Sequence, residues 1–526
     1  MTAYSRRTWF PLLTDLSCVC AVAVIWLCIG LSIFGSGLHA GILNDQVNYI
    51  TAARNLSVSG ELTSSIIYPS TLLQRYQRNY LYMPGHALVL SWSYTLFGYG
   101  VFQSFLPNLL SFVLTMICTF LSARKLYDRT TAYLSTALFL VFPLNLLYAV
   151  SAMAEMTLIA ATILALCVFL YLPDRAKPYL GACLPVLPFL FRETGALVIV
   201  PMAFLVFSRS QQYKLPRTLA FLLLACPGMA LVYKLELASG RPSLFLANYF
   251  DARYTTIYTD AVANASLSAT WNNTLMRLPH RIAENLTNFA AFIQIDSVRL
   301  FSCCYAVFFV LGLVGLCRGL LRRDAFAIST SVMVLTIFSS VVAFYYLGMT
   351  GIRIFLFTLP LSCIACAAFC RDLLSPLAAR FAPYLVGVLV FVMLAYTGFA
   401  GIASLSKVYS PLFQTCEPPL LEFTNRLEQL EHDDQTLLVC PCHLLMEYSL
   451  RHHPVKCAFL PANSATLDLL NGKYRIGTIL WDSGDPLTSL TLEDFVQRGF
   501  FPQAKIGYQG SDYWILRPGR WPSLSQ

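Results

Sequence analysis

The chain has 526 residues, of which 57% are apolar and only 12% are charged, and its mean hydropathy is +0.62. A soluble globular protein carries about 25% charged residues, so this composition excludes an ordinary soluble enzyme. The formal net charge of +9 comes from basic residues spread between apolar segments, without a single basic stripe, which argues against a nucleic-acid partner.

Long apolar runs dominate the chain as far as residue 405. The first, roughly 16–36, follows Arg6 and Arg7, which favours a signal anchor over a twin-arginine export signal. Further runs lie near 103–122, 131–150, 154–172, 178–191, 195–207, 218–235, 300–317, 325–346, 354–370 and 384–404. We therefore predict about eleven transmembrane helices, two of them short enough to be kinked or to pair as a hairpin.

Basic residues between these runs predict the orientation in the membrane. They lie in every second loop, at Arg124, Lys125 and Arg129, at Arg175 and Lys177, at Arg209, Lys214 and Arg217, at Arg318, Arg322 and Arg323, and at Arg371 and Arg380. All of these loops can be cytoplasmic together with the N-terminus, which places the tail after Ser404 outside the cytoplasm. We expect a multi-pass protein of a cell inner (plasma) membrane with a periplasmic or other extracytoplasmic tail.

Three segments are expected outside, namely 37–102, 237–299 and 406–526. Within the first, residues 87–98 are apolar but too short to cross, so we expect them to lie along the membrane face. The tail has ordinary globular composition, with helical spacing at 420–430 and short buried strands expected at 436–440 and 477–481. The predicted fold is thus a polytopic α-helical transmembrane domain, 1–405, followed by a small α/β domain, 406–526.

The first outer loop begins with the most informative residues. Tyr49, Ala53 and Leu56 recur at helical spacing, which predicts a short amphipathic helix on the outer membrane surface. Asp45 opens this helix. A carboxylate there can act as a helix cap, or it can face the aqueous interface as a general base.

Several motifs in this order resemble the type C superfamily of membrane glycosyltransferases, which includes protein O-mannosyltransferases and aminoarabinose transferases. In the first loop they are Asp45, Tyr49, Ala53-Arg54-Asn55-Leu56, Gly60 and Tyr82-Met83-Pro84-Gly85-His86. Further along they are Leu121 to Tyr127, Ser151 to Glu155, Phe189 to Gly195, and Tyr345-Tyr346 through Gly351-Ile352-Arg353. The chain departs from the usual His-Pro-Pro or Pro-Pro-Leu-Tyr pattern, because it keeps one proline and places His86 two residues after it.

The resemblance implies a role for each matching residue. Asp45 would be the general base for the acceptor hydroxyl, and Glu155 would orient the acceptor or raise the pKa of Asp45. The expected phosphate-binding residues are Arg353, Arg54 and Arg78, and the expected substrate-binding residues are Tyr49, Tyr82 and His86. Arg192 and Glu193 are weaker candidates, which we interpret as pairing with each other or with the membrane interface.

The resemblance therefore implies an inverting transferase that takes a sugar from a polyprenyl-phosphate carrier and gives it to a glycan, lipid or protein acceptor. No cofactor is required, although a divalent metal near Asp45 and Glu155 is compatible with the mechanism. Two other classes stay open. A transporter or flippase of lipid-linked saccharides would show internal repeats and mid-membrane charges, and a scaffold would bind lipid-linked sugars without catalysis.

Overall fold

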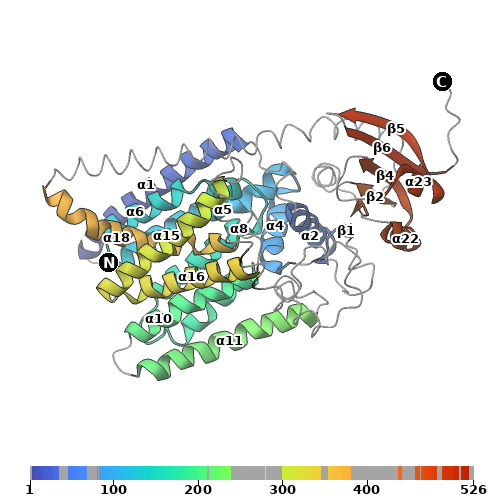
Figure 1. Cartoon of the computed structure of the whole chain (residues 1–526). Helices are drawn as coiled ribbons and strands as arrows, with labels where there is room; N and C mark the ends of the chain where they lie inside the picture. Colours follow the sequence, from blue (N-terminus) through green and yellow to red (C-terminus); the bar gives the residue numbers. More distant parts are fainter. Residues whose placement is uncertain are drawn as a thin grey trace.

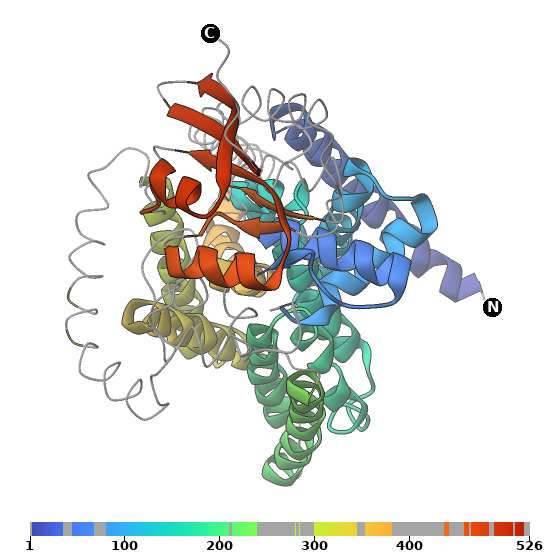
Figure 2. The ribbon, with the colours of Figure 1, turned by 90° about the vertical axis from the view of Figure 1, so that its right-hand side faces the viewer.

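The described part of the computed structural model consists of a helical bundle with a six-stranded sheet beyond one end (Figure 1). It covers residues 3–34, 45–67, 80, 82–209, 213–238, 279, 283, 299–344, 353–380, 436–440, 457–461, 464–482, 489–508 and 511–519. Turned by 90°, the sheet lies in front of the bundle (Figure 2).

Helices form most of the described chain up to residue 380. They are α1 (Ala3–Phe34), α2 (Asp45–Ser59), α4 (Pro84–Phe97), α5 (Val101–Leu126), α6 (Arg129–Val141), α7 (Pro143–Ala149), α8 (Ala154–Tyr171), α9 (Val186–Phe189), α10 (Ile199–Arg209), α11 (Lys214–Ala238), α15 (Arg299–Arg322), α16 (Ala325–Phe344) and α18 (Leu359–Arg380). Short 3₁₀ helices are η1 (Leu180–Cys183), η2 (Glu193–Val198) and η4 (Leu356–Thr358).

Five of the described helical segments are long and apolar enough to cross a membrane. They are Pro11–Ser32, Val101–Leu126, Ala154–Tyr171, Lys214–Leu235 and Arg353–Leu374. All predicted apolar runs up to residue 370 coincide with helical segments, whereas the run at 384–404 and the helix expected at 420–430 lie outside the described residues. The chain is therefore a multi-pass membrane protein, and the number of spans stays a prediction.

Prolines divide two of the predicted runs. The run at 131–150 forms α6 and α7, which meet at Phe142 and Pro143, and the run at 178–191 forms η1 and α9. Pro185 and Pro188 lie in this second run. Because proline has no backbone N–H and clashes with the preceding turn, it interrupts a regular helix.

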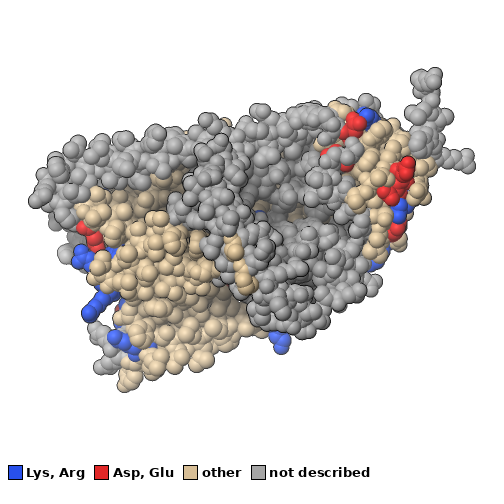
Figure 3. All heavy atoms as spheres, viewed as in Figure 1, with Lys and Arg blue, Asp and Glu red and all other residues tan. Residues whose placement is uncertain are grey.

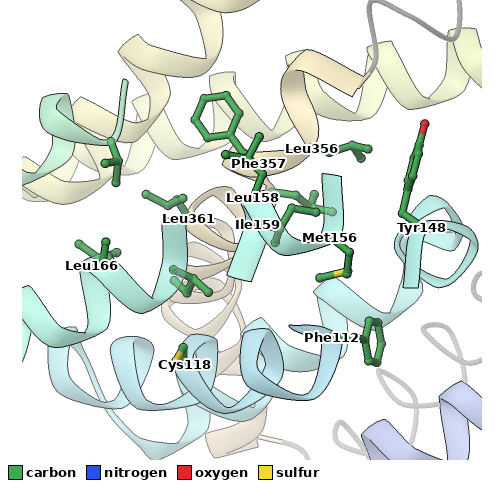
Figure 4. Close-up of a cluster of buried hydrophobic side chains, with 14 of the residues drawn as sticks. Phe112, Cys118, Tyr148, Met156, Leu158, Ile159, Leu166, Leu356, Phe357 and Leu361 are labelled. Atoms are coloured by element: carbon green, nitrogen blue, oxygen red, sulfur yellow. The ribbon is translucent and has the colours of Figure 1, made fainter. Parts of the chain in front are cut away.

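Helix α8 lies in the core of the bundle. It is apolar around its whole circumference, as expected for a helix that is covered on all sides, and nearly all of its side chains are buried. Leu158 and Ile159 lie in one buried cluster with Phe112 of α5 and Phe357 of η4 (Figure 4). In contrast, α1 and α11 are largely exposed, which places them at the periphery.

The sheet has the strand order β1-β3-β2-β4-β6-β5. Its strands are β1 (Ile66–Ile67), β2 (Leu437–Cys440), β3 (Cys457–Phe459), β4 (Ile476–Asp482), β5 (Phe500–Tyr508) and β6 (Ser511–Pro518). β1 to β4 are parallel, and β6 and β5 continue the sheet antiparallel. Helices α22 (Ser464–Lys473) and α23 (Leu492–Gln497) contribute Leu467, Leu470 and Phe495 to its core.

The strands expected at 436–440 and 477–481 are thus present as β2 and β4. The participation of β1 is a difference from the prediction, since this strand belongs to the first outer loop.

Charged side chains gather at the bundle end that is remote from the sheet, and the visible flank of the bundle is largely uncharged (Figure 3). At this end the buried Asp15 carboxylate is 3.0 Å from Arg124 Nη1 and 2.6 Å from Arg129 Nη2, and it accepts a hydrogen bond from Tyr133. Further ion pairs here join Arg371 to Asp128, Arg318 to Asp324 and Arg322 to Asp372. Basic residues that were expected on one side of the membrane therefore cluster together.

Candidate active site

A buried ion cluster joins three distant segments at the other end of the bundle. Glu155 lies in the first turn of α8, where the helix dipole favours a negative charge. Arg192 Nη1 and Arg353 Nε are each 2.6 Å from the same oxygen, Glu155 Oε1. The cluster therefore combines two guanidinium groups with one carboxylate.

The charges of this cluster are largely buried. Glu155 is 1% exposed and Arg353 is 7% exposed, so both charges are removed from bulk water. Buried charges are tolerated only with close partners of opposite sign. Guanidinium groups bind carboxylate or phosphate oxygens bidentately, so Arg192 and Arg353 are of the residue type that suits a phosphate.

The segment before Glu155 is held by side chains from two other helices. Asn108 of α5 donates hydrogen bonds to the carbonyl oxygens of Ser151 and Met153, at 2.6 and 2.7 Å. The Ala152 N–H donates to Gln46 Oε1 in the first turn of α2, at 2.8 Å. Because Asn108 and Gln46 are both buried, these bonds fix the start of α8 against α5 and α2.

The N-terminus of α4 contacts both segments that carry the Glu155–Arg192 pair. His86 Nε2 donates to the Ala152 carbonyl oxygen at 2.9 Å, three residues before Glu155. The adjacent Gly85 N–H donates to the Leu190 carbonyl oxygen at 2.8 Å, two residues before Arg192. A Cβ on Gly85 would lie only 2.7 Å from that oxygen, so the close approach requires glycine.

His86 is fully buried, and both of its ring nitrogens have partners. Nδ1 lies 2.9 Å from Thr157 Oγ1 on α8, and Nε2 bonds Ala152. Burial lowers the pKa of His86 to about 4, because the imidazolium would lose its hydration. A neutral ring that donates through Nε2 accepts at Nδ1. With both nitrogens engaged, this imidazole is a neutral connector between α4 and α8.

The three predicted substrate-binding residues lie together. The Tyr49 ring on α2 is 4.7 Å from the Tyr82 ring and 4.9 Å from the His86 ring, the latter edge-to-face. Tyr49 is buried and Tyr82 is half-buried. These aromatic contacts attach α2 to the beginning of α4. The ring nitrogens of His86 are directed to Ala152 and Thr157, so this side chain also connects α4 with the start of α8.

The remaining predicted site residues are placed less completely. Asp45 is the first residue of α2, next to Gln46, and its side chain lies outside the described residues. Arg54 lies on the same helix, 5.8 Å from the Tyr99 ring, in a cation–π arrangement. Arg78 and the segment 345–352 also lie outside the described residues.

Arg192 was a weaker candidate in the sequence, expected to pair with the adjacent Glu193 or with the membrane interface. The structure shows an ion pair of Arg192 with Glu155 of α8. Gln46 and Asn108 were not predicted at all. The similarity of Phe189 to Gly195 to a family motif was the only signal that favoured Arg192.

Arginine engages one of the two oxygens of the Glu155 carboxylate. Its Oε1 atom is shared by two guanidinium groups, which a cation would have to displace. Within the described ranges, His, Cys, Asp and Glu side chains form no group of three that could hold a metal ion.

Comparison with known families gives one sequence match. Residues 83–233 match the dolichyl-phosphate-mannose-protein mannosyltransferase family. The matched segment extends from the start of α4 into α11 and contains His86, Glu155 and Arg192, whereas Asp45 and Arg353 lie outside it. No curated protein matches the chain by sequence.

Solved structures share the fold over most of the chain. ArnT from Cupriavidus metallidurans bound to undecaprenyl phosphate is 14% identical with a TM-score of 0.52, covering 94% of this chain and 98% of ArnT. The Archaeoglobus fulgidus oligosaccharyltransferase in complex with Zn and sulfate is 13% identical with a TM-score of 0.53, covering 88% of this chain and 68% of that chain. At these identities the likeness concerns the fold.

Proposed function

Because the chain has the fold of the type C membrane glycosyltransferases, we propose that it is an inverting glycosyltransferase that moves a monosaccharide from a polyprenyl-phosphate carrier to an acceptor on the outer side of the membrane. The observation that carries this proposal is the buried cluster of Glu155, Arg192 and Arg353. The start of α2, where the proposed base Asp45 is found, is tied to the same segment, because Gln46 bonds Ala152, three residues before Glu155.

The reaction is a single displacement at the anomeric carbon. Asp45 takes the proton of the acceptor hydroxyl while the hydroxyl oxygen bonds to that carbon. The bond between the anomeric carbon and the phosphate oxygen breaks on the opposite face, which inverts the configuration. The departing polyprenyl phosphate keeps the bonding electrons, and its negative charge is stabilised by Arg353 and Arg192.

Glu155 has a supporting part in this mechanism. By accepting hydrogen bonds from both arginines, it fixes their planar groups before the donor binds, so that little reorganisation is needed. We also propose that Arg54 and Arg78 contact the donor phosphate, and that Tyr49 and Tyr82 line the sugar site. The undecaprenyl phosphate bound to ArnT supports a carrier of this class.

The proposed arrangement in the membrane follows the charge distribution. The arginine-rich end around Asp15 would face the cytoplasm with the N-terminus, and the sheet would lie outside with the tail domain 406–526 and the outer loops 37–102 and 237–299. Helix α4 exposes Trp92, Leu96 and Phe97, while Ala87 and Leu90 are buried. An apolar exposed face that includes Trp is typical of a helix at the membrane interface.

The proposal is tested by supplying the purified protein with a panel of polyprenyl-phosphate monosaccharides and membrane-derived acceptors. We expect free polyprenyl phosphate and a glycosylated product in equal amounts, and no reaction with nucleotide sugars. Movement of an intact lipid-linked saccharide across proteoliposomes, without cleavage of its sugar–phosphate bond, would instead establish a flippase.

A further inference from the structure

The first outer loop turns back along α2 before it reaches the sheet. Residues 61–67, which we call the strap, follow the end of α2 and finish as β1. Asn48, Thr51 and Asn55 lie three and four residues apart, so they share one face of α2. The face of α2 that carries Tyr49 differs from this polar face, because it makes aromatic contacts with the beginning of α4.

Hydrogen bonds attach the strap to this polar face. Ser64 Oγ lies 3.0 Å from Thr51 Oγ1 and donates to Asn48 Oδ1 at 3.3 Å. Asn55 Nδ2 donates to the Thr63 carbonyl oxygen at 2.8 Å. Asn48, Thr51 and Ser64 are all buried, and buried polar groups are costly when they lose their partners. The strap therefore constrains the orientation of α2.

The end of the strap completes the sheet of the C-terminal tail. Ile66 and Ile67 pair in parallel with Cys457 and Ala458 of β3, and the Cys457 N–H donates to the Ser65 carbonyl oxygen at 3.0 Å. Ile66 is fully buried by this addition. Pairing of an added strand with a sheet edge is a recognised docking mode in which backbone hydrogen bonds supply the affinity.

We propose that the C-terminal sheet is a positioning element for α2 and that it acts through β1 and the strap. The positioning residues are Asn48, Thr51 and Ser64, which transmit the location of β3 to the helix that begins with Asp45. This proposal rests on the proposed function, because it assigns α2 the task of presenting the base. Helix α2 is thus held from two sides, by α4 through Tyr49 and by the tail through Ser64.

The first experiment tests the pairing itself and does not depend on activity. Ile66→Cys places a thiol opposite Cys457, and strands lie about 4.8 Å apart, within the range that a disulfide spans. We expect mild oxidation of the full-length protein to link positions 66 and 457, identified by mass spectrometry. Ile66→Cys combined with Cys457→Ser must lose this link, and Val58→Cys, which is exposed at the end of α2, must not form it. Absence of the 66–457 link in the folded protein would overturn the proposal.

The second experiment tests positioning. Cys457→Pro removes the N–H that donates to Ser65, and position 457 is the first residue of β3, where proline is tolerated best. Cys457→Ala keeps that N–H and is the matched control. In the proline variant we expect faster amide hydrogen exchange in α2 and a kcat lower by roughly 10- to 100-fold. Its KM for the lipid donor should be unchanged. The alanine variant should differ little from the wild type in all three measurements.

Hydrogen exchange separates the two possible failures. Unchanged exchange in α2 of Cys457→Pro would overturn the positioning role, whatever the transfer activity. If α2 exchanges faster in Cys457→Pro but the wild-type protein transfers no sugar, the proposed function is contradicted. The coupling between the sheet and α2 then still stands. If Cys457→Pro does not fold, Ser64→Ala interrupts the same connection at the α2 side and must show the same faster exchange.

Discussion

Glu155 and Arg353 are 198 positions apart in the chain, yet Arg353 Nε lies 2.6 Å from Glu155 Oε1. The same oxygen is 2.6 Å from Arg192 Nη1. This shared atom brings together the start of α8, the segment before η2 and the start of the span Arg353–Leu374. Loss of the carboxylate would leave two neighbouring cations in a region with little water.

The first prediction concerns this carboxylate. Glu155→Gln should lower the free energy of unfolding by about 3–5 kcal/mol, because it removes the partner of a buried charge. It should also lower sugar transfer per folded molecule, since the two arginines lose their common anchor. Thermal unfolding in detergent and transfer assays on the folded fraction measure the two effects separately.

Asp15→Asn is the matched control for this variant. Asp15 is also a buried carboxylate that pairs with two arginines, Arg124 and Arg129, but it lies at the opposite end of the bundle. We expect Asp15→Asn to lower stability and to leave transfer per folded molecule unchanged. Equal losses of transfer in both variants would show that the Glu155 effect is general destabilisation.

The second prediction concerns the phosphate. Arg353→Gln should weaken binding of free polyprenyl phosphate by on the order of 10- to 100-fold, because the phosphate loses a hydrogen bond from one charged group. Arg322→Gln is a suitable control, because its exposed side chain is 3.6 Å from Asp372 at the opposite end, and exposed pairs contribute little. Isothermal titration in detergent gives both affinities. Unchanged binding by Arg353→Gln would remove Arg353 from the donor site.

The third prediction concerns the close approach of α4 to the segment before Arg192. Gly85→Ala would bring a Cβ within 2.7 Å of the Leu190 carbonyl oxygen, so that the backbone must shift. We expect a loss of stability of about 1–3 kcal/mol and reduced donor binding, because Arg192 follows Leu190 closely. Gly472→Ala, whose Cβ would meet no atom within 4 Å, should leave donor binding unchanged.

The fourth prediction is a pH dependence. His86 has a pKa of about 4 in the folded protein against 6.5 for the unperturbed group, so the unfolded chain binds more protons between these values. The stability that neutral His86 contributes is fully present above about pH 6.5 and is lost as pH falls towards 4. His86→Gln should flatten this dependence of unfolding on pH. An unchanged slope in the variant would show that folding does not shift the pKa of His86.

Apolar runs predicted the helical segments well, because the membrane requires long uncharged helices. The division of the run 131–150 at Pro143 was not predicted. The resemblance to the type C glycosyltransferase superfamily is confirmed by the family match and the shared fold. The partner of Arg192 could not be predicted in the same way. Glu155 lies 37 positions before Arg192, and only the packing of α8 brings the two side chains together.

The burial of the polar face of α2 also could not be predicted from the sequence pattern. The spacing of Tyr49, Ala53 and Leu56 predicted a helix with one apolar face on the membrane surface. Tyr49 and Ala53 are buried and Leu56 is half-buried, but Asn48 and Thr51 on another face are buried too. Hydrophobic periodicity detects an apolar helix face, but it does not show that a polar face is covered. The strap that covers this face ends in the strand Ile66–Ile67, which is too short to show an alternating pattern. Pairing of this strand with a segment nearly four hundred residues later depends on tertiary structure alone.

The central claim is most directly tested by single-turnover sugar transfer from a polyprenyl-phosphate donor, comparing the wild type with Asp45→Asn. Loss of a general base lowers transfer by on the order of 10²- to 10⁴-fold, and we predict this loss with unchanged donor binding and unchanged hydrogen exchange in α2. Transfer by Asp45→Asn at the wild-type rate would contradict the account and leave Asp45 as the N-terminal cap of α2.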